Sequence, residues 1–329
     1  MWAGSEWVEQ GTRWASDQLE RLGIGIVGPG EQIRLESWSA VLRLPTTGGS
    51  MFFKAVTPVH GFEPTLTNLL ARIRPGSVSD VVAIDEERRW MLTRDGGTRL
   101  RELVRTPGDV RLWEEALPQY AELQIAVAEA GIDLLTLGVP DQRLAALPEL
   151  LERVLEDRDA LLIGQPAGLS AEQAVELRRR APSFGTQCAD LAAYGIPETI
   201  QHDDLHDGNV FVNDGRYVFF DWGDSCVSHP FTTLAVTLRA LAWKLDLEPG
   251  GSWAARLRDA YLEPWRNLDS RDGLEAAFEL AYAVGTVARA LAWYRMTAPE
   301  KPEDRGDDAE SIPYGLRLWL EGGRLGTWH

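Results

Sequence analysis

The chain has 329 residues, of which 44% are hydrophobic and 25% are charged, and its formal net charge at pH 7 is −17. This composition is that of an ordinary globular protein, and the length suffices for two domains or one two-lobed unit. The excess of carboxylates argues against nucleic acid, whose phosphates are bound mainly by Lys and Arg. It is compatible with a small cationic partner, or with a charge that only keeps the protein in solution.

The cellular setting is predicted from cysteines and from the amino-terminal sequence. Two cysteines, Cys188 and Cys226, form neither a disulfide framework nor a metal-binding spacing. The first ten residues lack the basic and apolar segments of a signal peptide, and no apolar run approaches the roughly 18 residues of a membrane span. We therefore expect a cytoplasmic protein without membrane association and without an obligate protein partner.

The first third of the chain consists mainly of short β-rich runs separated by turns. The pattern predicts strands at 23–28, 39–44, 50–56, 81–84 and 88–92. The turn sequence PTTGGS predicts a hairpin between the second and third of these strands. One helix is expected at 63–74, where leucines and an isoleucine recur at helical spacing. This part is predicted to be an antiparallel sheet that carries one helix.

Beyond about residue 100 the apolar residues follow mostly a helical period. Helices are expected at 112–131, 171–195, 231–246 and 274–296, with an exposed loop at 297–311 before a last helix near 314–320. Pro118 and Pro182 are expected to start, end or kink their helices. Tryptophans in these helical patterns, Trp243, Trp293 and Trp319, are expected in the core.

One strand pair stands among these helices. Residues 210–220 contain two β-rich runs joined by NDGR, which predicts a hairpin with a tight turn. Antiparallel pairing makes Asn209 and Asp221 cross-strand neighbours, with backbones about 5 Å apart. Two oxygen-bearing side chains at this separation suit Mg²⁺, which is commonly held by one or two protein groups and by substrate phosphates.

The loop before this hairpin carries a further acidic residue at a defined spacing. His202, Asp204 and Asn209 follow the protein-kinase catalytic-loop pattern, with Asp203 in place of its arginine. The sequence Asp-Trp-Gly that begins at Asp221 takes the place of the metal-binding Asp-Phe-Gly. The alternative is that these Asp and Asn side chains only cap turns.

The two stretches HDDLHDGNVFV and FFDWGDS resemble the aminoglycoside phosphotransferase and choline kinase group of small-molecule kinases. The resemblance implies an α+β, two-lobed protein-kinase-like fold. Residues 1–94 would be a nucleotide-binding lobe with a small antiparallel sheet and one helix. Residues 95–329 would be a larger, mainly helical lobe with the catalytic hairpin, the metal site and the acceptor pocket.

A kinase of this kind needs a cation for the nucleotide phosphates on its third strand. The chain contains only three lysines among 33 basic residues, and Lys54 lies in the third predicted strand. Its compact ammonium group suits phosphate oxygens. The alternative is an edge-strand lysine that faces water. Its expected carboxylate partner is Glu63, although Pro64 places Glu63 at a helix start, where it is also explained as a charge favoured by the helix dipole.

The remaining nucleotide contacts are implied only by the resemblance. Ser37 and Ser39 would offer hydroxyl or N–H groups to phosphate, in a loop without glycine where turn-capping serines would look the same. The backbone from Leu92 to Arg94 would bind adenine. The nucleotide would be ATP, with GTP left open, and the metal ion Mg²⁺.

The mechanism predicted from these residues is phosphoryl transfer to a hydroxyl group. Asn209 and Asp221 would hold Mg²⁺, Lys54 would steady the triphosphate, and Asp204 would take the acceptor proton. The added charge of Asp203 and the nearby Asp224 favour a small cationic acceptor, such as an aminoglycoside, an amino sugar or a related antibiotic or metabolite.

Two other classes of protein stay open. The first is a metal-dependent phosphohydrolase, which would need further histidine ligands in a chain with five histidines. The second is a kinase-like binding protein without catalysis. Such a protein would be expected to have lost at least one of the residues that the chemistry needs, but all four are present: Lys54, Asp204, Asn209 and Asp221.

Overall fold

The computed structural model describes residues 6–299 and 305–323, and its contacts divide the chain into two compact units. The first unit comprises 1–102, 133–139 and 208–223, and the second comprises 103–132, 140–207 and 224–329. The sequence analysis expected one boundary, between 94 and 95, and a hairpin in the second lobe. The hairpin groups with the first unit because its strand β8 (Val210–Asn213) pairs with β6 (Thr98–Arg99).

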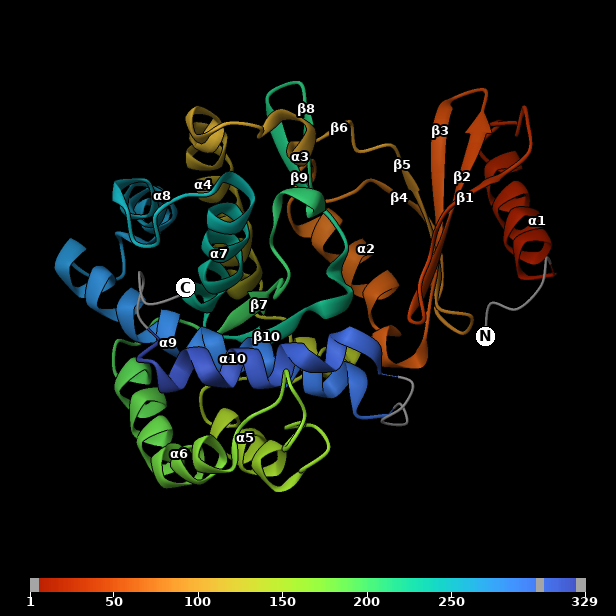
Figure 1. Ribbon diagram of the computed structural model, residues 1–329. Coiled ribbons are helices and arrows are strands. Elements are labelled where there is room, and N and C mark those ends of the chain that lie inside the picture. The colour runs from red at the N-terminus through yellow and green to blue at the C-terminus, as the bar shows by residue number, and fades with distance from the viewer. Residues whose placement is uncertain (1–5, 300–304, 324–329) are drawn as a thin grey trace. The chain divides into compact units, whose positions relative to one another are not determined.

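The first unit is built on a five-stranded antiparallel sheet with the strand order β1-β2-β3-β5-β4 (Figure 1). Its strands are β1 (Glu31–Leu35), β2 (Ser39–Thr46), β3 (Gly49–Val56), β4 (Val81–Asp85) and β5 (Trp90–Arg94). The strand expected at 23–28 is wrong, because that segment makes only an isolated bridge from Ile26 to Thr46. The actual first strand was missed because all five of its residues are exposed and give no burial pattern.

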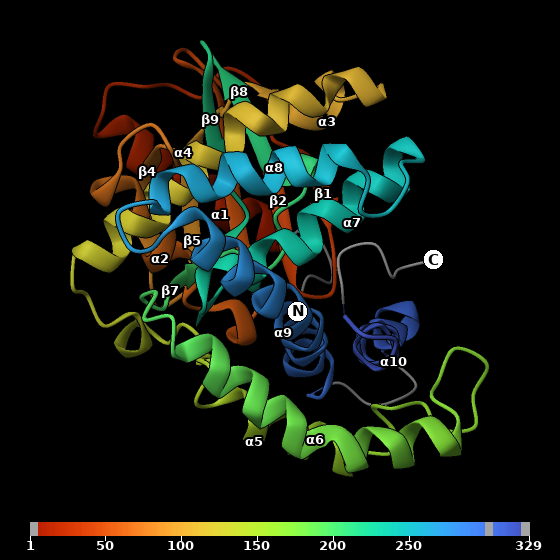
Figure 2. The same ribbon diagram turned by 90° about the vertical axis from the view of Figure 1, so that its left-hand side faces the viewer.

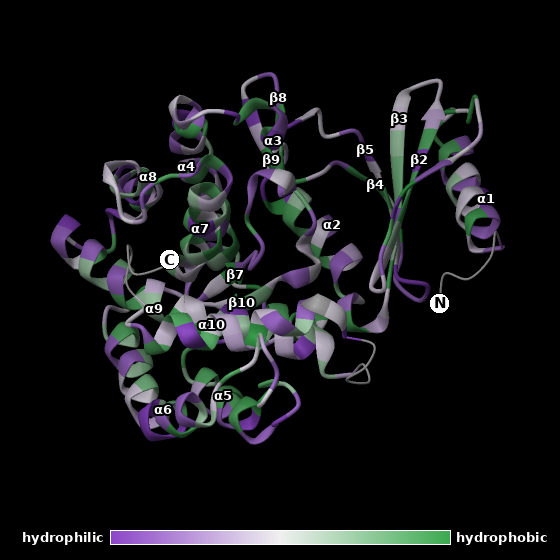
Figure 3. Cartoon of the chain, in the orientation of Figure 1, coloured by the Kyte–Doolittle hydropathy of each residue, from purple (hydrophilic) through white to green (hydrophobic). Residues whose placement is uncertain are grey.

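Two helices, rather than the expected one, accompany this sheet. Helix α1 (Glu6–Glu20) packs on one face, where Ala15 and Leu19 join the core around Phe53. Figure 3 shows both hydrophilic and hydrophobic residues on α1, as expected for a helix with one buried face. Helix α2 (Glu63–Ile73) agrees with the prediction and lies on the other side of the sheet in Figure 1.

The alternation of β3 sends neighbouring side chains to these two faces. Met51, Phe53 and Ala55 face the core that they share with α1. Lys54, between the last two, therefore faces away from that core and toward α2. This placement results from the two-residue period of the strand.

The predicted hairpin consists of β8 (Val210–Asn213) and β9 (Arg216–Phe219). Asp214 and Gly215 have φ angles of 49° and 77°, which a tight hairpin turn of this kind requires. The predicted register is wrong by one residue. Val210 pairs with Phe219, and the Phe220 N–H donates to the Asn209 carbonyl at 3.1 Å, so the neighbour of Asn209 is Phe220 rather than Asp221.

The second unit is mainly helical, as expected. Figures 1 and 2 both show α5 and α6 beside α9 and α10. Its elements are α4 (Arg111–Glu129), α5 (Leu147–Glu156), α6 (Ala171–Ala192), α7 (Leu234–Leu245), α8 (Ser252–Leu262), α9 (Arg271–Thr297), α10 (Ser311–Leu320), and the strands β7 (Thr199–Gln201) and β10 (Cys226–Ser228). Short helices occur in both units. They are α3 (Leu100–Leu103) at the boundary, and 3₁₀ turns at 58–60, 107–110, 134–137, 207–209, 222–224, 230–233, 263–265 and 306–310.

Several local expectations for the helices can be compared with the structure. Pro118 and Pro182 lie inside α4 and α6, so they neither start nor end these helices, and a kink at either position stays a prediction. Trp319 is buried, but Trp243 is 90% exposed and is not a core residue. The expected loop at 297–311 contains a 3₁₀ turn and buried Arg305, while its part at 300–304 lies outside the described residues. No described helix has the length and apolar character needed to cross a membrane.

Candidate active site

Lys54 lies between two carboxylates of the first unit. Its ammonium nitrogen is 2.6 Å from Glu63 Oε1 and 2.6 Å from Asp221 Oδ1. Glu63, the first residue of α2, is fully buried, and the side chains of Lys54 and Asp221 are 13% and 25% exposed. Strand β3, helix α2 and the end of the hairpin thus bring these three predicted residues together.

The two carboxylates of this cluster stabilise the protonated form of Lys54. Burial disfavours the ammonium form of Lys54, but the Asp221 and Glu63 carboxylates outweigh this effect and hold the pKa of Lys54 above its ordinary value. Lys54 therefore stays protonated at neutral pH. It is a fixed positive charge at a site where phosphate oxygens are expected.

Asp221 is held in a conformation that few non-glycine residues adopt. Its φ is +69°, in the left-handed region. The next residue, Trp222, is fully buried and donates its indole N–H to the Phe219 carbonyl at 3.2 Å. A Cβ on Gly223 would lie 3.2 Å from Glu63 Oε2, so a small residue is needed there. Backbone strain of this kind is concentrated at functional sites.

Asp221 and Asn209 are of the residue types that could hold a magnesium ion together with substrate phosphates. Asp221 and Asn209 supply carboxylate and amide oxygens, and Asn209 is buried to 5% exposure. Among the described residues no three His, Cys, Asp or Glu side chains gather into a metal-binding group. A hard cation with one or two protein ligands, completed by phosphates and water, needs no such group.

In the described part of the chain, no hydrogen bond or ion pair joins the other predicted nucleotide residues to the side chain of Lys54. Ser37 lies exposed in the turn between β1 and β2, and Ser39 is buried at the start of β2. Leu92 lies in the core between strands β3 and β4. Arg94 ends β5, where its backbone N–H donates to the Asp80 carbonyl. The backbone of residues 92–94, which was expected to bind adenine, is thus part of a strand that pairs with β3 and β4.

Sequence reasoning missed one cation of the first unit. Arg34 of β1 lies 3.4 Å from Asp221 Oδ2, so the two carboxylate oxygens of Asp221 each face a positive side chain. The signal was weak, because Arg34 is one of many arginines and its strand was not predicted.

The predicted base belongs to the second unit, in the loop that follows β7. His202 is fully buried, and its backbone N–H donates to the Tyr120 hydroxyl at 3.0 Å. The Asp204 N–H donates to His202 Nδ1 at 3.4 Å, so His202 braces this loop. Asp203 has a φ of +61° and is 2% exposed.

Three carboxylates of this unit converge on one arginine. Arg289, on α9, lies 2.9 Å from Asp204 Oδ1, 2.9 Å from Asp224 Oδ2 and 3.5 Å from Asp203 Oδ2. Its guanidinium carbon lies 4.9 Å from the ring centre of Trp293, one turn further along the helix. Arg289 itself is 7% exposed, so these charges interact where screening by water is weak.

The arginine separates the pKa values of the two neighbouring aspartates. Burial raises the pKa of Asp203 to about 7, although Arg289 acts in the opposite direction. Burial also acts on Asp204, but Arg289 and His206 outweigh it and lower the pKa of Asp204. The pKa values of these two carboxyl groups, which are adjacent in sequence, are thus shifted in opposite directions. Such a difference is typical of acid–base sites.

Arg289 was missed by the sequence analysis, yet the sequence holds a signal for it. Between Glu279 and Arg295 it is the only charged residue in an otherwise apolar helical stretch. A lone charge of this kind inside a buried helix requires a partner. His206, whose Nε2 lies 3.3 Å from Asp204 Oδ2, was left without a role for lack of such a pattern.

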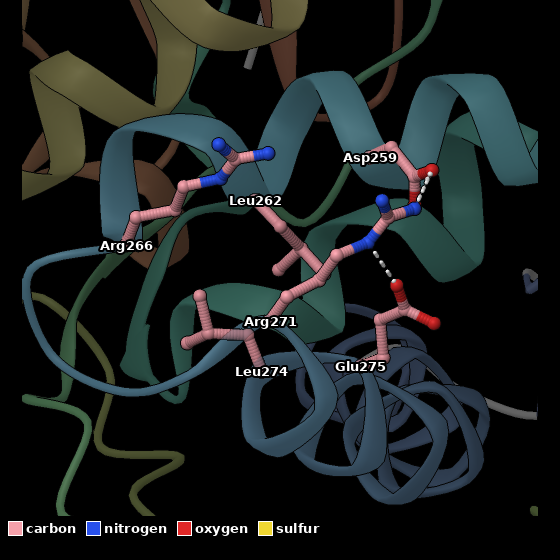
Figure 4. Close-up of a pocket in the computed structure, with 6 residues that line it drawn as sticks. All are labelled: Asp259, Leu262, Arg266, Arg271, Leu274 and Glu275. Atoms are coloured by element: carbon pink, nitrogen blue, oxygen red, sulfur yellow. Dashed lines mark hydrogen bonds and ion pairs between the residues drawn. The ribbon is translucent and has the colours of Figure 1, made fainter.

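A small pocket elsewhere in the second unit contains no comparable chemistry. It lies between α8 and α9 and has a volume of about 10 Å³, room for about one water molecule (Figure 4). Arg271 crosses it to Asp259 and Glu275 at 2.8 and 2.7 Å. The fourth charged residue of its lining, Arg266, forms an ion pair with Glu263, so each of these charges already has a partner.

A small antiparallel sheet with a buried Lys–Glu pair, a hairpin ending in Asp-Trp-Gly and a mainly helical second unit define the protein-kinase-like class of fold. The family profile described as "Phosphotransferase enzyme family" matches residues 59–274, more than half of the sequence. The chain therefore belongs to this phosphotransferase family. A comparison with curated proteins gave no match.

Solved structures share this fold at low sequence identity. A putative fructosamine-3-kinase from Thermobifida fusca is 18% identical with a TM-score of 0.58, covering 93% of this chain and 98% of that one. A macrolide 2′-phosphotransferase from Brachybacterium faecium is 18% identical with a TM-score of 0.56, covering 92% and 97%. An amicoumacin kinase in complex with AMP-PNP and Ca²⁺ is 13% identical with a TM-score of 0.59, covering 98% of both chains.

Proposed function

We propose that this phosphotransferase is an ATP-dependent small-molecule kinase that transfers the γ-phosphoryl group to an alcohol. The observation that carries the proposal is the ion pairing of Lys54 with both Glu63 and Asp221 at 2.6 Å. This arrangement matches the Lys–Glu pair and metal-binding aspartate that phosphoryl transfer from ATP requires in kinases. The ATP analogue in the amicoumacin kinase structure supports the choice of nucleotide, with GTP left open.

The proposed reaction needs little covalent chemistry from the protein. The acceptor oxygen attacks the γ-phosphorus, a new P–O bond forms, and the bond to the β,γ-bridging oxygen breaks to release ADP. Asp204 accepts the hydroxyl proton and passes it to water. Its lowered pKa keeps it ionised, and therefore ready to accept a proton, at neutral pH.

Lys54, Asn209 and Asp221 form the proposed nucleotide side of the reaction. Asn209 and Asp221 would hold Mg²⁺, which when bound neutralises phosphate charge. Lys54 would exchange part of its contact with Asp221 for phosphate oxygens. Arg34, on the other oxygen of Asp221, offers a second cation for the same purpose. Ser37, Ser39, Leu92 and Arg94 stay proposals from the resemblance.

The carboxylates from which a cationic acceptor was predicted do not support that prediction. Asp203 and Asp224 were expected to attract a positive group, but both face Arg289. An aminoglycoside or amino sugar would compete with that arginine for them. We therefore propose only a hydroxyl-bearing small molecule here. The identity of this acceptor molecule would decide whether the reaction serves antibiotic resistance or metabolism.

The two alternative classes find less support. In the described part of the chain no cluster of His, Cys, Asp or Glu provides the additional ligands that a metal-dependent phosphohydrolase would need. A silent binding protein would not need an ionised Asp204 held by both Arg289 and His206.

The proposal is tested by separating nucleotide binding from turnover. Mg²⁺ and ATP together should raise the melting temperature of the wild type, whereas Mn²⁺ alone should not. Asp221→Ala should weaken this stabilisation, because it removes a metal ligand and one partner of Lys54. Asp204→Ala should keep the stabilisation and lose ADP release with a phosphorylated acceptor, by about 100-fold or more.

The matched control is Asp259→Ala, which removes a carboxylate on α8 that pairs with Arg258 and Arg271. It should change neither nucleotide binding nor turnover. Near-normal rates in Asp204→Ala would rule out its role as the base. Stabilisation by Mg²⁺ and ATP that survives Asp221→Ala unchanged would rule out the metal assignment.

A further inference from the structure

Arg239, on α7, is a half-buried arginine without a carboxylate partner. Its guanidinium carbon lies 5.3 Å from the ring centre of Tyr314 on α10. Its Nη1 is buried and has no hydrogen-bond partner, and among the described residues Arg239 takes part in no hydrogen bond or ion pair. The chain has 50 acidic residues for 33 basic ones, so an unpaired arginine in this position calls for an explanation.

The energetic argument points toward a ligand. An unsatisfied buried donor costs about 1–3 kcal/mol, more when it is charged. The planar guanidinium donates in a fixed fork that fits carboxylate and phosphate oxygens. Burial lowers the pKa of Arg239 and Arg289 acts in the same direction, whereas Tyr314, Tyr282 and Asp203 act to raise it. An added anion would also raise this pKa.

Helix α7 is fastened to the loop that carries the proposed base. The Thr237 hydroxyl donates to the Leu205 carbonyl at 2.7 Å, and Lys244 forms an ion pair with Asp207. Leu205 and Asp207 follow Asp204 by one and three residues. The stretch of α7 between its two attachments contains Arg239 and Trp243, which lie one helical turn apart on the same side.

Two exposed aromatic side chains accompany the arginine. Trp243 is 90% exposed and Tyr314 is 41% exposed. A tryptophan that is almost completely exposed on a helix contributes little to the core, but it offers a flat surface for stacking. Arg239, Trp243 and Tyr314 thus combine a cation with two accessible rings, and we call them the α7–α10 patch.

Resting on the proposed kinase function, we propose that the α7–α10 patch recognises the acceptor, and that this acceptor carries an anionic oxygen group, carboxylate or phosphate, beside a ring. Arg239 binds the anionic group, while Trp243 and Tyr314 stack on the ring.

This charge preference agrees with the surroundings of the base. Arg289 already balances part of the charge of Asp203, Asp204 and Asp224, and Lys244 pairs with Asp207. Among the residues that the structure describes, an anionic acceptor thus meets paired carboxylates and Arg239, for which no carboxylate partner is found there. A cationic acceptor would meet Arg239 with repulsion.

The test uses four probes with one sugar skeleton: glucuronate, glucose 6-phosphate, glucose and glucosamine. Thermal shift and calorimetry are run on the full chain with saturating Mg²⁺ and ADP, so that the nucleotide site is filled. We expect glucuronate or glucose 6-phosphate to bind at least about tenfold more tightly than glucose and glucosamine, as one charged hydrogen-bonded contact allows. Whichever anionic probe binds better distinguishes carboxylate from phosphate.

Arg239→Met should remove this preference, Arg239→Lys should keep part of it, and Trp243→Ala should weaken all four probes equally. Arg256→Met is the matched control, since Arg256 is an exposed arginine on α8 that pairs with Glu114. It should leave the preference intact. Tighter binding of glucosamine, no binding of either anionic probe, or an anion preference that survives Arg239→Met would overturn the inference.

Failure of this inference differs from failure of the kinase proposal. Stabilisation by Mg²⁺ and ATP depends on Asp221 and not on Arg239. If that stabilisation stays while the probes show no anion preference, only the acceptor class is wrong. If it is missing in the wild type while anion binding still depends on Arg239, the patch binds anions but the kinase proposal fails.

Discussion

At the scale of single residues, Arg289 determines how the acidic loop behaves. One guanidinium contacts three carboxylates and is covered by the ring of Trp293. Bidentate and shared contacts of this kind suit arginine better than lysine. Since removal of one member of a buried ion-pair network leaves uncompensated charge, Arg289 has effects on both catalysis and stability.

The first prediction concerns the pH dependence of turnover. Asp204 must be ionised to accept a proton, and Arg289 lowers its pKa. Arg289→Met should therefore move the acid limb of kcat/KM to higher pH by about 1 to 3 units. Arg289→Lys keeps the charge and should leave the limb near its wild-type position. An acid limb that stays in place in Arg289→Met would show that Asp204 does not govern it.

A second prediction concerns stability and Asp203. The pKa of Asp203 in the folded state, about 7, lies above the ordinary value of 3.8 for an aspartate in an unfolded chain, so the folded state binds more protons between these pH values. The free energy of unfolding should fall as pH rises from about 4 to 7, by on the order of 1–4 kcal/mol. Asp203→Asn tolerates the left-handed backbone and cannot titrate.

The measurement is urea unfolding of both proteins at pH 5 and pH 8. Asp203→Asn should gain stability relative to the wild type at the higher pH. An equal difference at both pH values would mean that Asp203 does not titrate in this interval.

At the scale of elements, the hairpin and the segment before β6 approach each other so closely that glycine is needed. A Cβ on Gly97 would lie 2.6 Å from the Val212 carbonyl oxygen of β8, and the φ of Gly97 is +104°. This approach lets β6 pair with β8 and attaches the hairpin to the first unit.

The third prediction follows from this contact. Gly97→Ala should lower the free energy of unfolding by about 2–3 kcal/mol, through backbone strain and displacement of β8. Gly23→Ala is the control, since Gly23 has a φ of +70° but nothing within 4 Å of its Cβ position. It should cost only about 1 kcal/mol. Equal losses in the two variants would show that the contact with Val212 is not important.

At the scale of the whole molecule, net charge dominates the electrostatics. The formal charge of −17 makes the folded chain repel itself, while exposed ion pairs are worth about 0–1 kcal/mol each. Added salt screens both the net repulsion and the attraction within ion pairs. The repulsion involves all charges of the chain, whereas each ion pair involves only two, so screening should weaken the repulsion more.

A fourth prediction results. The melting temperature should rise by a few degrees between about 10 and 150 mM NaCl, because the Debye length shortens from roughly 30 to 8 Å. Scanning fluorimetry without nucleotide measures this shift. A melting temperature that falls with salt would show that the ion pairs outweigh the repulsion.

Local patterns in the sequence predicted a large part of this protein. The helices α2, α4, α6, α7 and α9, four of the five strands of the main sheet and the hairpin turn all follow from periodicity and turn chemistry. Lys54 was expected on the third strand with Glu63 as its carboxylate partner, and Asp221 was expected from the Asp-Trp-Gly motif. The structure places the Lys54 ammonium group within hydrogen-bonding distance of both carboxylates. These features depend on residues close in sequence or on strong motifs.

Tertiary structure alone decided the rest. The exposed edge strand β1 has no burial pattern, and the hairpin register depends on one residue that periodicity cannot determine. Arg289 meets Asp204 across 85 residues of sequence, and Trp243 is exposed although its helix looks apolar. Local sequence determines which segments become helix or strand, but the partner of a charge and the face of a helix that stays uncovered depend on how distant segments pack.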